Sequence, residues 1–108
     1  MKAQKTAAII LAAGHGTRMK SALPKVMHEI GGRAMIAHVI DAAGALEPSR
    51  MAVVIGDHAP DVGGFAQSVR DGIAVAVQSP PQGTGHAVMQ ALPALEDFSG
   101  AVLVLYAD

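Results

Sequence analysis

Short apolar runs alternate along the chain with segments of helical period, and this pattern predicts an α/β fold. Residues 7–12 form a continuous apolar run that ends in the glycines of Gly14-His15-Gly16, as expected for a strand buried on both faces. Three further apolar runs follow, at residues 51–55, 73–77 and 101–107. Three segments with helical character separate the four runs, at residues 34–46, 60–70 and 85–96. We expect Pro93 to kink the last helix or to end it early.

This order of elements predicts a three-layer, Rossmann-like fold with a parallel sheet, because each pair of successive strands is joined through a helix. In an open parallel sheet, ligands bind outside the carboxyl ends of the strands. The segments that leave those ends are residues 13–25, 56–58, 78–84 and Asp108. They hold most of the glycines and polar residues that a buried core would not need. We therefore expect a binding site at this edge of the sheet.

Composition narrows the classes of function. The chain has 108 residues, of which 51% are hydrophobic and 16% charged, as expected for one well-buried domain over residues 1–108. Its formal net charge of -1 argues against nucleic acid and anionic membranes as partners. There is no cysteine, which excludes disulfides, thiolate metal sites and thiol catalysis. The first apolar run is too short for a membrane span, so we expect a cytoplasmic protein.

The segment LAAGHGTRMKSALPKV, which follows the first strand, has the composition of an anion-binding loop. Gly14 and Gly16 let the backbone approach a ligand closely, and Arg18 and Lys25 carry charge suited to phosphate oxygens. Two known phosphate loops are excluded, because Met19 stands where the dinucleotide motif needs a third glycine and no Gly-Lys-Ser/Thr triplet occurs. The alternative is a flexible turn with solvated cations.

A second glycine-containing segment, QSPPQGTGHAV, precedes the last helix. The side-chain amide of Gln78 can donate and accept at once, which suits the edge of a nucleobase. The backbone amides of Gly83, Thr84 and Gly85 lie where a helix begins and where an acceptor is favoured. A purely structural alternative makes Thr84 the N-cap of that helix. Of the five histidines, His86 alone is placed near a site by this pattern.

Asp108 follows the apolar run Leu103-Val104-Leu105-Tyr106-Ala107. A carboxylate at the tip of a buried strand costs free energy unless a partner neutralises it. A divalent cation bound to a nucleotide phosphate is one such partner. The alternative is an exposed residue at the end of the chain.

Taken together, these segments resemble the sugar-phosphate nucleotidyltransferases, whose pattern is L-A-A-G-x-G-T-R-M followed by P-K. The later segments QSPPQGTGHAV and VLYAD agree with that family in order and spacing. His28, Gly32 and the run HVIDAA resemble the branch that transfers a uridylyl group to N-acetylglucosamine 1-phosphate. The resemblance covers almost the whole chain.

The resemblance implies a Mg²⁺-dependent transfer from UTP to N-acetylglucosamine 1-phosphate, with UDP-N-acetylglucosamine and pyrophosphate as products. It gives Arg18 and Lys25 the catalytic role of holding the triphosphate, and Asp108 the role of a Mg²⁺ ligand. The residues that it places at UTP are Leu11, Ala12, Ala13, Gly14, Gly16, Lys25, Gln78, Gly83 and Thr84. Other bases or sugars, and a non-catalytic nucleotide-binding or interaction module, stay open as alternatives.

The chain departs from the family pattern in places. His15 stands where lysine is frequent, Pro81 near a frequent glutamine, and Ala107 where glycine is frequent. The family's pyrophosphorylase domain is longer, and an acetyltransferase β-helix normally follows it. The resemblance therefore implies the N-terminal half of the nucleotidyltransferase fold, an incomplete active site, and a homo-oligomer for the full-length protein. In such a piece, residues 101–107 form an apolar edge strand that favours self-association.

Overall fold

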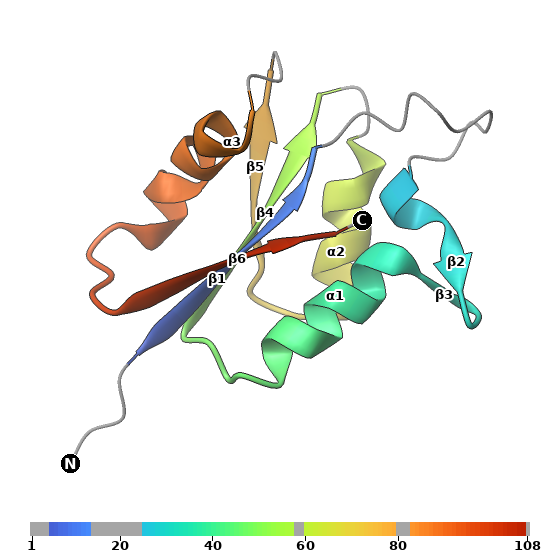
Figure 1. Cartoon of the computed structure of the whole chain (residues 1–108), viewed down its shortest axis with the longest axis horizontal. Coiled ribbons are helices and arrows are strands. Elements are labelled where there is room, and N and C mark those ends of the chain that lie inside the picture. Colours follow the sequence, from blue (N-terminus) through green and yellow to red (C-terminus); the bar gives the residue numbers. More distant parts are fainter. Residues whose placement is uncertain (1–4, 14–24, 58–59, 80–82, 108) are drawn as a thin grey trace.

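The computed structural model describes residues 5–13, 25–57, 60–79 and 83–107, with Lys25 described by its backbone alone. Four parallel strands form one sheet in the order β5-β4-β1-β6 (Figure 1). The strands are β1 (Thr6–Ala12), β4 (Arg50–Gly56), β5 (Ala74–Gln78) and β6 (Ala101–Tyr106). Each lies where the sequence predicts a strand, and the parallel pairing confirms the predicted α/β fold.

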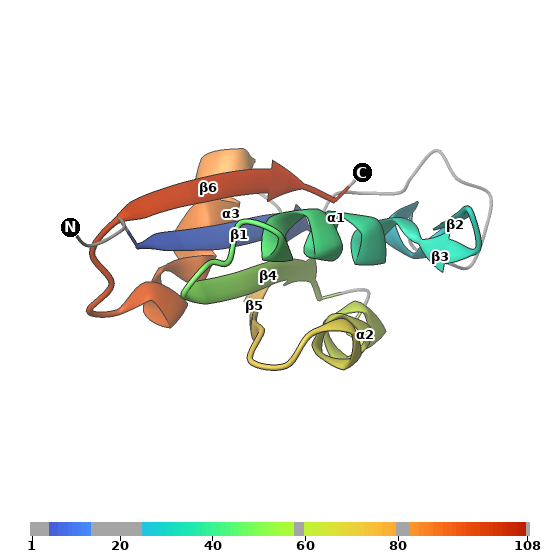
Figure 2. The same cartoon turned by 90° about the horizontal axis from the view of Figure 1, so that it is seen from below.

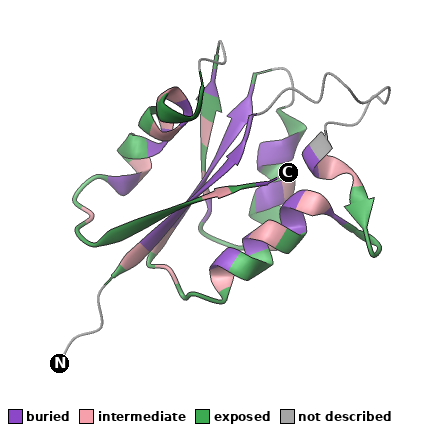
Figure 3. Ribbon diagram, viewed as in Figure 1, coloured by how far each residue is buried: buried purple, intermediate pink, exposed green. Residues whose placement is uncertain are grey.

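Helices cover the sheet on both sides and give three layers (Figures 1 and 2). On one face lie α1 (Met35–Gly44) and α2 (Asp61–Val69), and on the other lies α3 (Thr84–Ala91). Side chains alternate along β1, so that Ile10 packs in the core beneath α1 and α2 while Ile9 packs in the core beneath α3. Both are fully buried, which explains why β1 is a continuous apolar run (Figure 3).

The helix α2 approaches the sheet closely through Gly63. A Cβ atom added at Gly63 would lie 2.9 Å from Cγ1 of Val75 and 3.3 Å from Cδ1 of Ile55. A Cβ added at Gly64 would meet nothing within 4 Å. Glycine lowers helix propensity, and the packing at Gly63 supplies a reason for its presence inside this helix.

A small hairpin between β1 and α1 was not predicted. It consists of β2 (Glu29–Ile30) and β3 (Arg33–Ala34), preceded by the 3-10 helix η1 (Lys25–Met27). Gly31 and Gly32 form the turn with φ of 63° and 85°, the positive values that a tight two-residue hairpin turn requires. The hairpin is tied to α1, since Nε2 of His38 donates a hydrogen bond of 2.6 Å to the carbonyl oxygen of Ile30. An exposed ion pair between Arg33 and Asp41 adds a second link.

The last helix is shorter than its predicted range. It ends at Ala91 and passes into a 3-10 turn, η2 (Leu92–Leu95), that contains Pro93. Proline has no backbone N–H to donate, and its ring clashes with the preceding turn of an α-helix. The early end that the sequence predicts for this helix is therefore confirmed.

The strand β6 lies at the edge of the described sheet and pairs there with β1 alone. Its side chains are largely exposed, in contrast to those of β1 (Figure 3). The large exposed apolar residues of this strand are Val102, Leu103, Val104 and Tyr106. The apolar edge expected from the sequence is therefore present in this chain.

Candidate functional site

The carboxyl ends of the four parallel strands meet at one edge of the sheet. The chain passes from β1 to β4 and β5 on one side, and then returns through α3 to β6 on the other side of β1. The order of strands reverses next to β1, and such a switch point is where open α/β sheets bind ligands. Here the backbone N–H of Ala107 donates a hydrogen bond of 3.0 Å to the carbonyl oxygen of Leu11. This bond fixes the two strand ends side by side.

The end of β1 also packs against α3. Leu11 and Ala13 belong to the same buried cluster as Ala87 and Ala91 of α3. Because three of these four side chains are alanine, β1 and α3 can approach closely. The predicted residues Leu11, Ala12 and Ala13 thus lie at the end of β1, and all three are buried. Leu11 and Ala13 face α3, whereas Ala12 packs in the core beneath α1 and α2.

Gln78, at the end of β5, connects the sheet to the start of α3. It is 4% exposed, and it is the buried polar side chain among the described residues. Its Nε2 donates a hydrogen bond of 3.1 Å to the carbonyl oxygen of Gly83 and lies 3.0 Å from Nδ1 of His86. The carbonyl of Gly83 also accepts the N–H of Ala87 at 3.1 Å. The structure therefore brings Gln78, Gly83 and His86 together, as the sequence reasoning placed them.

The interpretation of Thr84 as N-cap was wrong. Gly83 occupies the N-cap position with φ of 93° and ψ of 175°, and no side-chain capping bond is made there. A positive φ is strained for residues that have a Cβ, so glycine takes this position and Thr84 becomes the first helical residue. Its Oγ1 lies 3.2 Å from the hydroxyl of Tyr106, which links α3 to β6.

A polar contact that sequence reasoning did not identify joins β4 to β5. Oγ of Ser79 donates a hydrogen bond of 2.5 Å to Oδ2 of Asp57. Each residue directly follows the end of its strand, and these strands are neighbours in the sheet. The register of β4 and β5 pairs Gly56 with Gln78 and so sets the next residues, Asp57 and Ser79, opposite each other. The sequence alone does not give this register.

Several predicted site residues lie outside the described part of the chain. They are Gly14, Gly16, Arg18, Asp108 and the side chain of Lys25. Within the described ranges, no three histidine or carboxylate side chains come together to hold a metal ion. No helix of the described residues is long and apolar enough to cross a membrane.

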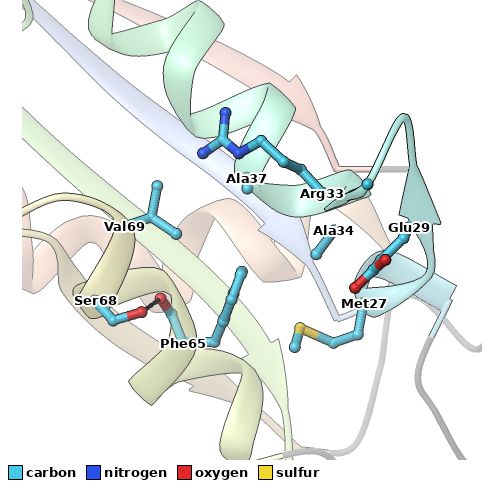
Figure 4. Close-up of a pocket in the computed structure, with 9 residues that line it drawn as sticks. Met27, Glu29, Arg33, Ala34, Ala37, Phe65, Ser68 and Val69 are labelled. Carbon is cyan, nitrogen blue, oxygen red and sulfur yellow. Dashed lines mark hydrogen bonds between the residues drawn. The ribbon is translucent and has the colours of Figure 1, made fainter.

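A pocket of about 600 Å³ opens elsewhere, between the hairpin, α1 and α2 (Figure 4). Met27, Phe65 and Val69 form much of its apolar wall, and the close-up shows Glu29 and Arg33 on the hairpin side. Ser68 points its hydroxyl to the carbonyl oxygen of Phe65. None of the predicted site residues in the described part of the chain lines this pocket.

A parallel sheet whose strand order reverses beside β1 defines the class of open α/β domains that bind ligands at the carboxyl edge of the sheet. The family model of the MobA-like NTP transferase domain matches residues 8–108. Because the match spans nearly the whole chain, the chain belongs to this family.

Individual relatives refine this result. The chain is 54% identical over 102 residues to the bifunctional protein GlmU of Caulobacter vibrioides, covering 94% of this chain and 22% of that protein. It is 55% identical over 107 residues to GlmU of Rhodospirillum rubrum, covering 96% of this chain and 22% of that protein. The chain thus spans about a fifth of the length of these relatives.

A solved structure supports the fold. The inositol-1-phosphate CTP transferase from T. maritima matches with a TM-score of 0.78 at 18% identity. The match covers 100% of this chain and 45% of that chain. At this identity the likeness concerns the fold alone, and it confirms the predicted nucleotidyltransferase fold.

Proposed function

We propose that this chain forms the nucleotide-binding part of an enzyme that transfers a uridylyl group from UTP to N-acetylglucosamine 1-phosphate. The products are UDP-N-acetylglucosamine and pyrophosphate. The observation that carries the proposal is the buried amide of Gln78, held against the start of α3 at the edge where β1 ends. Family membership and the similarity to GlmU support the same reading.

In this proposal, the uracil lies between the backbone of residues 11–13 and the first turn of α3. Gln78 offers a side-chain amide to the edge of the base. The first N–H groups of a helix have no partner within the helix, and they favour acceptors such as a base carbonyl. Gly83 lacks a Cβ, and nothing lies within 4 Å of where one would be, which leaves room for a flat ring.

The triphosphate would lie along residues 14–25, against Arg18 and Lys25. An oxygen of the sugar's phosphate attacks the α-phosphorus of UTP, and the bond from that phosphorus to the oxygen bridging it to the β-phosphorus breaks. Pyrophosphate leaves with the electron pair. The attacking oxygen is already anionic, so no general base is needed. Arg18 and Lys25 align the phosphates and neutralise their charge, which is how this chemistry is accelerated.

Mg²⁺ bound to the UTP phosphates would supply further charge neutralisation. Asp108 is the proposed protein ligand, since carboxylate oxygens are the donors that Mg²⁺ prefers. Asp108 directly follows Ala107, which is buried and bonded to the end of β1. The carboxylate of Asp108 would therefore follow the strand next to the switch point, which suits a Mg²⁺ ion bound to the phosphates of UTP there.

The sugar site is assigned to a part of the protein that this chain does not contain. The relatives are several times longer than this chain. We propose that residues 1–108 supply the nucleotide half of the site. In a protein as long as these relatives, the sugar-binding half and an acetyltransferase β-helix would belong to the remaining residues. We place that protein in the cytoplasm as a homo-oligomer.

Calorimetric titration of the chain with UTP and Mg²⁺ tests the proposal. We expect UTP to bind more tightly than GTP, CTP or dTTP, and Gln78→Leu to weaken UTP binding by roughly 10-fold or more, because a buried polar contact is lost. Gln67→Leu is the matched control, since Gln67 lies on α2 and its Nε2 bonds the carbonyl oxygen of Ile73. Tighter binding of another nucleotide would favour a related transferase. Equal binding by wild type and Gln78→Leu would refute the site.

A further inference from the structure

The pocket between the hairpin, α1 and α2 has the size and the lining of a small-molecule site. Its volume of about 600 Å³ lies in the range of roughly 300–1,000 Å³ that such sites occupy. Its apolar wall is formed by Met27, Phe65 and Val69, which pack against the core and stay partly exposed at the pocket (Figure 4). Ala34 and Ala37 bring only methyl groups to the lining, which leaves room among the larger side chains. A ligand with an apolar body would cover this surface and exclude water from it.

The register of the hairpin decides which of its two charged side chains faces the pocket. Residues directly opposite each other in an antiparallel pair lie on the same face. Glu29 is opposite Ala34, which is buried and lines the pocket. Ile30 is opposite Arg33, so these two residues lie on the outer face of the hairpin. Glu29 is therefore the charged residue on the inner face.

The polar groups that remain available to a ligand are hydrogen-bond acceptors. Arg33 extends toward α1 at the rim of the pocket, where it forms the ion pair with Asp41 (Figure 4). None of the hydrogen bonds and ion pairs among the described residues involves Glu29, whose carboxylate points from the hairpin toward the pocket (Figure 4). The hydroxyl of Ser68 donates its proton to the carbonyl oxygen of Phe65, so it offers the pocket lone pairs alone. The pocket thus favours a ligand that donates hydrogen bonds and carries positive charge.

We propose that this pocket binds apolar amines, in which a protonated amino group is attached to a short hydrocarbon or aromatic body. The ammonium group donates a hydrogen bond to the carboxylate of Glu29, and the apolar body covers Met27, Phe65 and Val69. The charge of Glu29 attracts the amine and repels an acid with the same apolar body, which makes the site selective. This proposal is independent of the proposed nucleotide-binding function.

An NMR titration of the unmodified chain with two probes tests the site. Phenethylamine and hydrocinnamate share the same hydrocarbon body and end in an ammonium group and a carboxylate, respectively. We expect millimolar phenethylamine to shift the resonances of Met27, Phe65 and Val69, and to bind more tightly than hydrocinnamate by about 3-fold or more. Equal or tighter binding of hydrocinnamate would overturn the selection by charge. The absence of shifts at these residues with either probe would overturn the site itself.

Substitutions at two exposed positions separate the charge from the cavity. Glu29→Gln removes the charge and keeps the size of the side chain, and we expect it to weaken phenethylamine binding by about 2- to 5-fold, the range of a partly exposed ion pair. Glu47→Gln is the matched control, since Glu47 is an exposed carboxylate that follows α1 and does not line the pocket. Ser68→Phe should weaken both probes, because its ring would occupy part of the pocket. Equal effects of Glu29→Gln and Glu47→Gln would overturn the role of Glu29, and unchanged binding of both probes to Ser68→Phe would overturn the site.

Discussion

The two adjacent glycines of α2 offer a sharp test of how this helix packs on the sheet. Replacing glycine by alanine inside a helix stabilises it by about 0.5–1 kcal/mol, because alanine loses less backbone entropy on folding. Gly64 is exposed, and a Cβ there meets nothing within 4 Å. We therefore expect Gly64→Ala to raise the free energy of unfolding by that amount.

Gly63→Ala brings the same gain in helix propensity, but the added methyl group would collide with side chains of the sheet. Its Cβ would lie 2.9 Å from Cγ1 of Val75, closer than such atoms normally approach, and 3.3 Å from Cδ1 of Ile55. Forcing a methyl group into a packed interface costs about 1–3 kcal/mol. Val75 lies on β5 at the edge of the sheet and is 36% exposed, so it can yield in part. We expect Gly63→Ala to be neutral or destabilising, by up to about 2 kcal/mol.

Urea unfolding followed by circular dichroism measures both variants in the same protein. The expected difference between them is about 0.5–3 kcal/mol, or a separation in Tm of roughly 4–8 °C for each kcal/mol in a domain of this size. Equal stabilisation by the two substitutions would refute the close packing of α2 on β4 and β5. A destabilising Gly64→Ala would refute the exposure of that face.

Three other outcomes are expected. Ile10→Ala should lower the free energy of unfolding by about 2–5 kcal/mol in a urea titration, because Ile10 is fully buried in the core; a cost below 1 kcal/mol would contradict that packing. Val104→Lys should reduce self-association in analytical ultracentrifugation, since Val104 lies on the exposed apolar edge, and an unmodified chain that stays monomeric at high concentration would argue against this edge. Pyrophosphate release from UTP and N-acetylglucosamine 1-phosphate should stay near background for the 108-residue chain, and normal turnover would show that no further residues are needed.

The strands were predictable because the sheet buries both faces of its central strands. Thr6–Ala12 and Arg50–Gly56 are almost wholly buried, and burial on two faces requires the continuous apolar runs visible in the sequence. The hairpin was missed because its strands have two residues each, too few to show a period. Gly31-Gly32 was its one available signal.

The grouping of the candidate site residues was more predictable than their contacts. The order of elements placed Gln78, Gly83 and His86 near one edge of the sheet, and the structure brings these residues together there. The N-cap was predicted at Thr84 because threonine is a residue type that often caps helices. The actual N-cap position depends on the positive φ of Gly83, which the sequence does not show. The contact between Gln78 and His86 spans eight positions across a sequence segment with two prolines, so no helical or strand period relates the two side chains.

The central claim is that nucleotide binds at the carboxyl edge formed by β1, β5 and α3. A two-dimensional NMR titration of the chain with UTP and Mg²⁺ tests it most directly. We expect the resonances of Ala12 and Ala13, the side chain of Gln78 and residues 83–86 to shift, while those of Phe65 and Val69 at the pocket between α1 and α2 stay in place. Shifts confined to that pocket, with the edge unchanged, would show that nucleotide does not bind at the carboxyl edge.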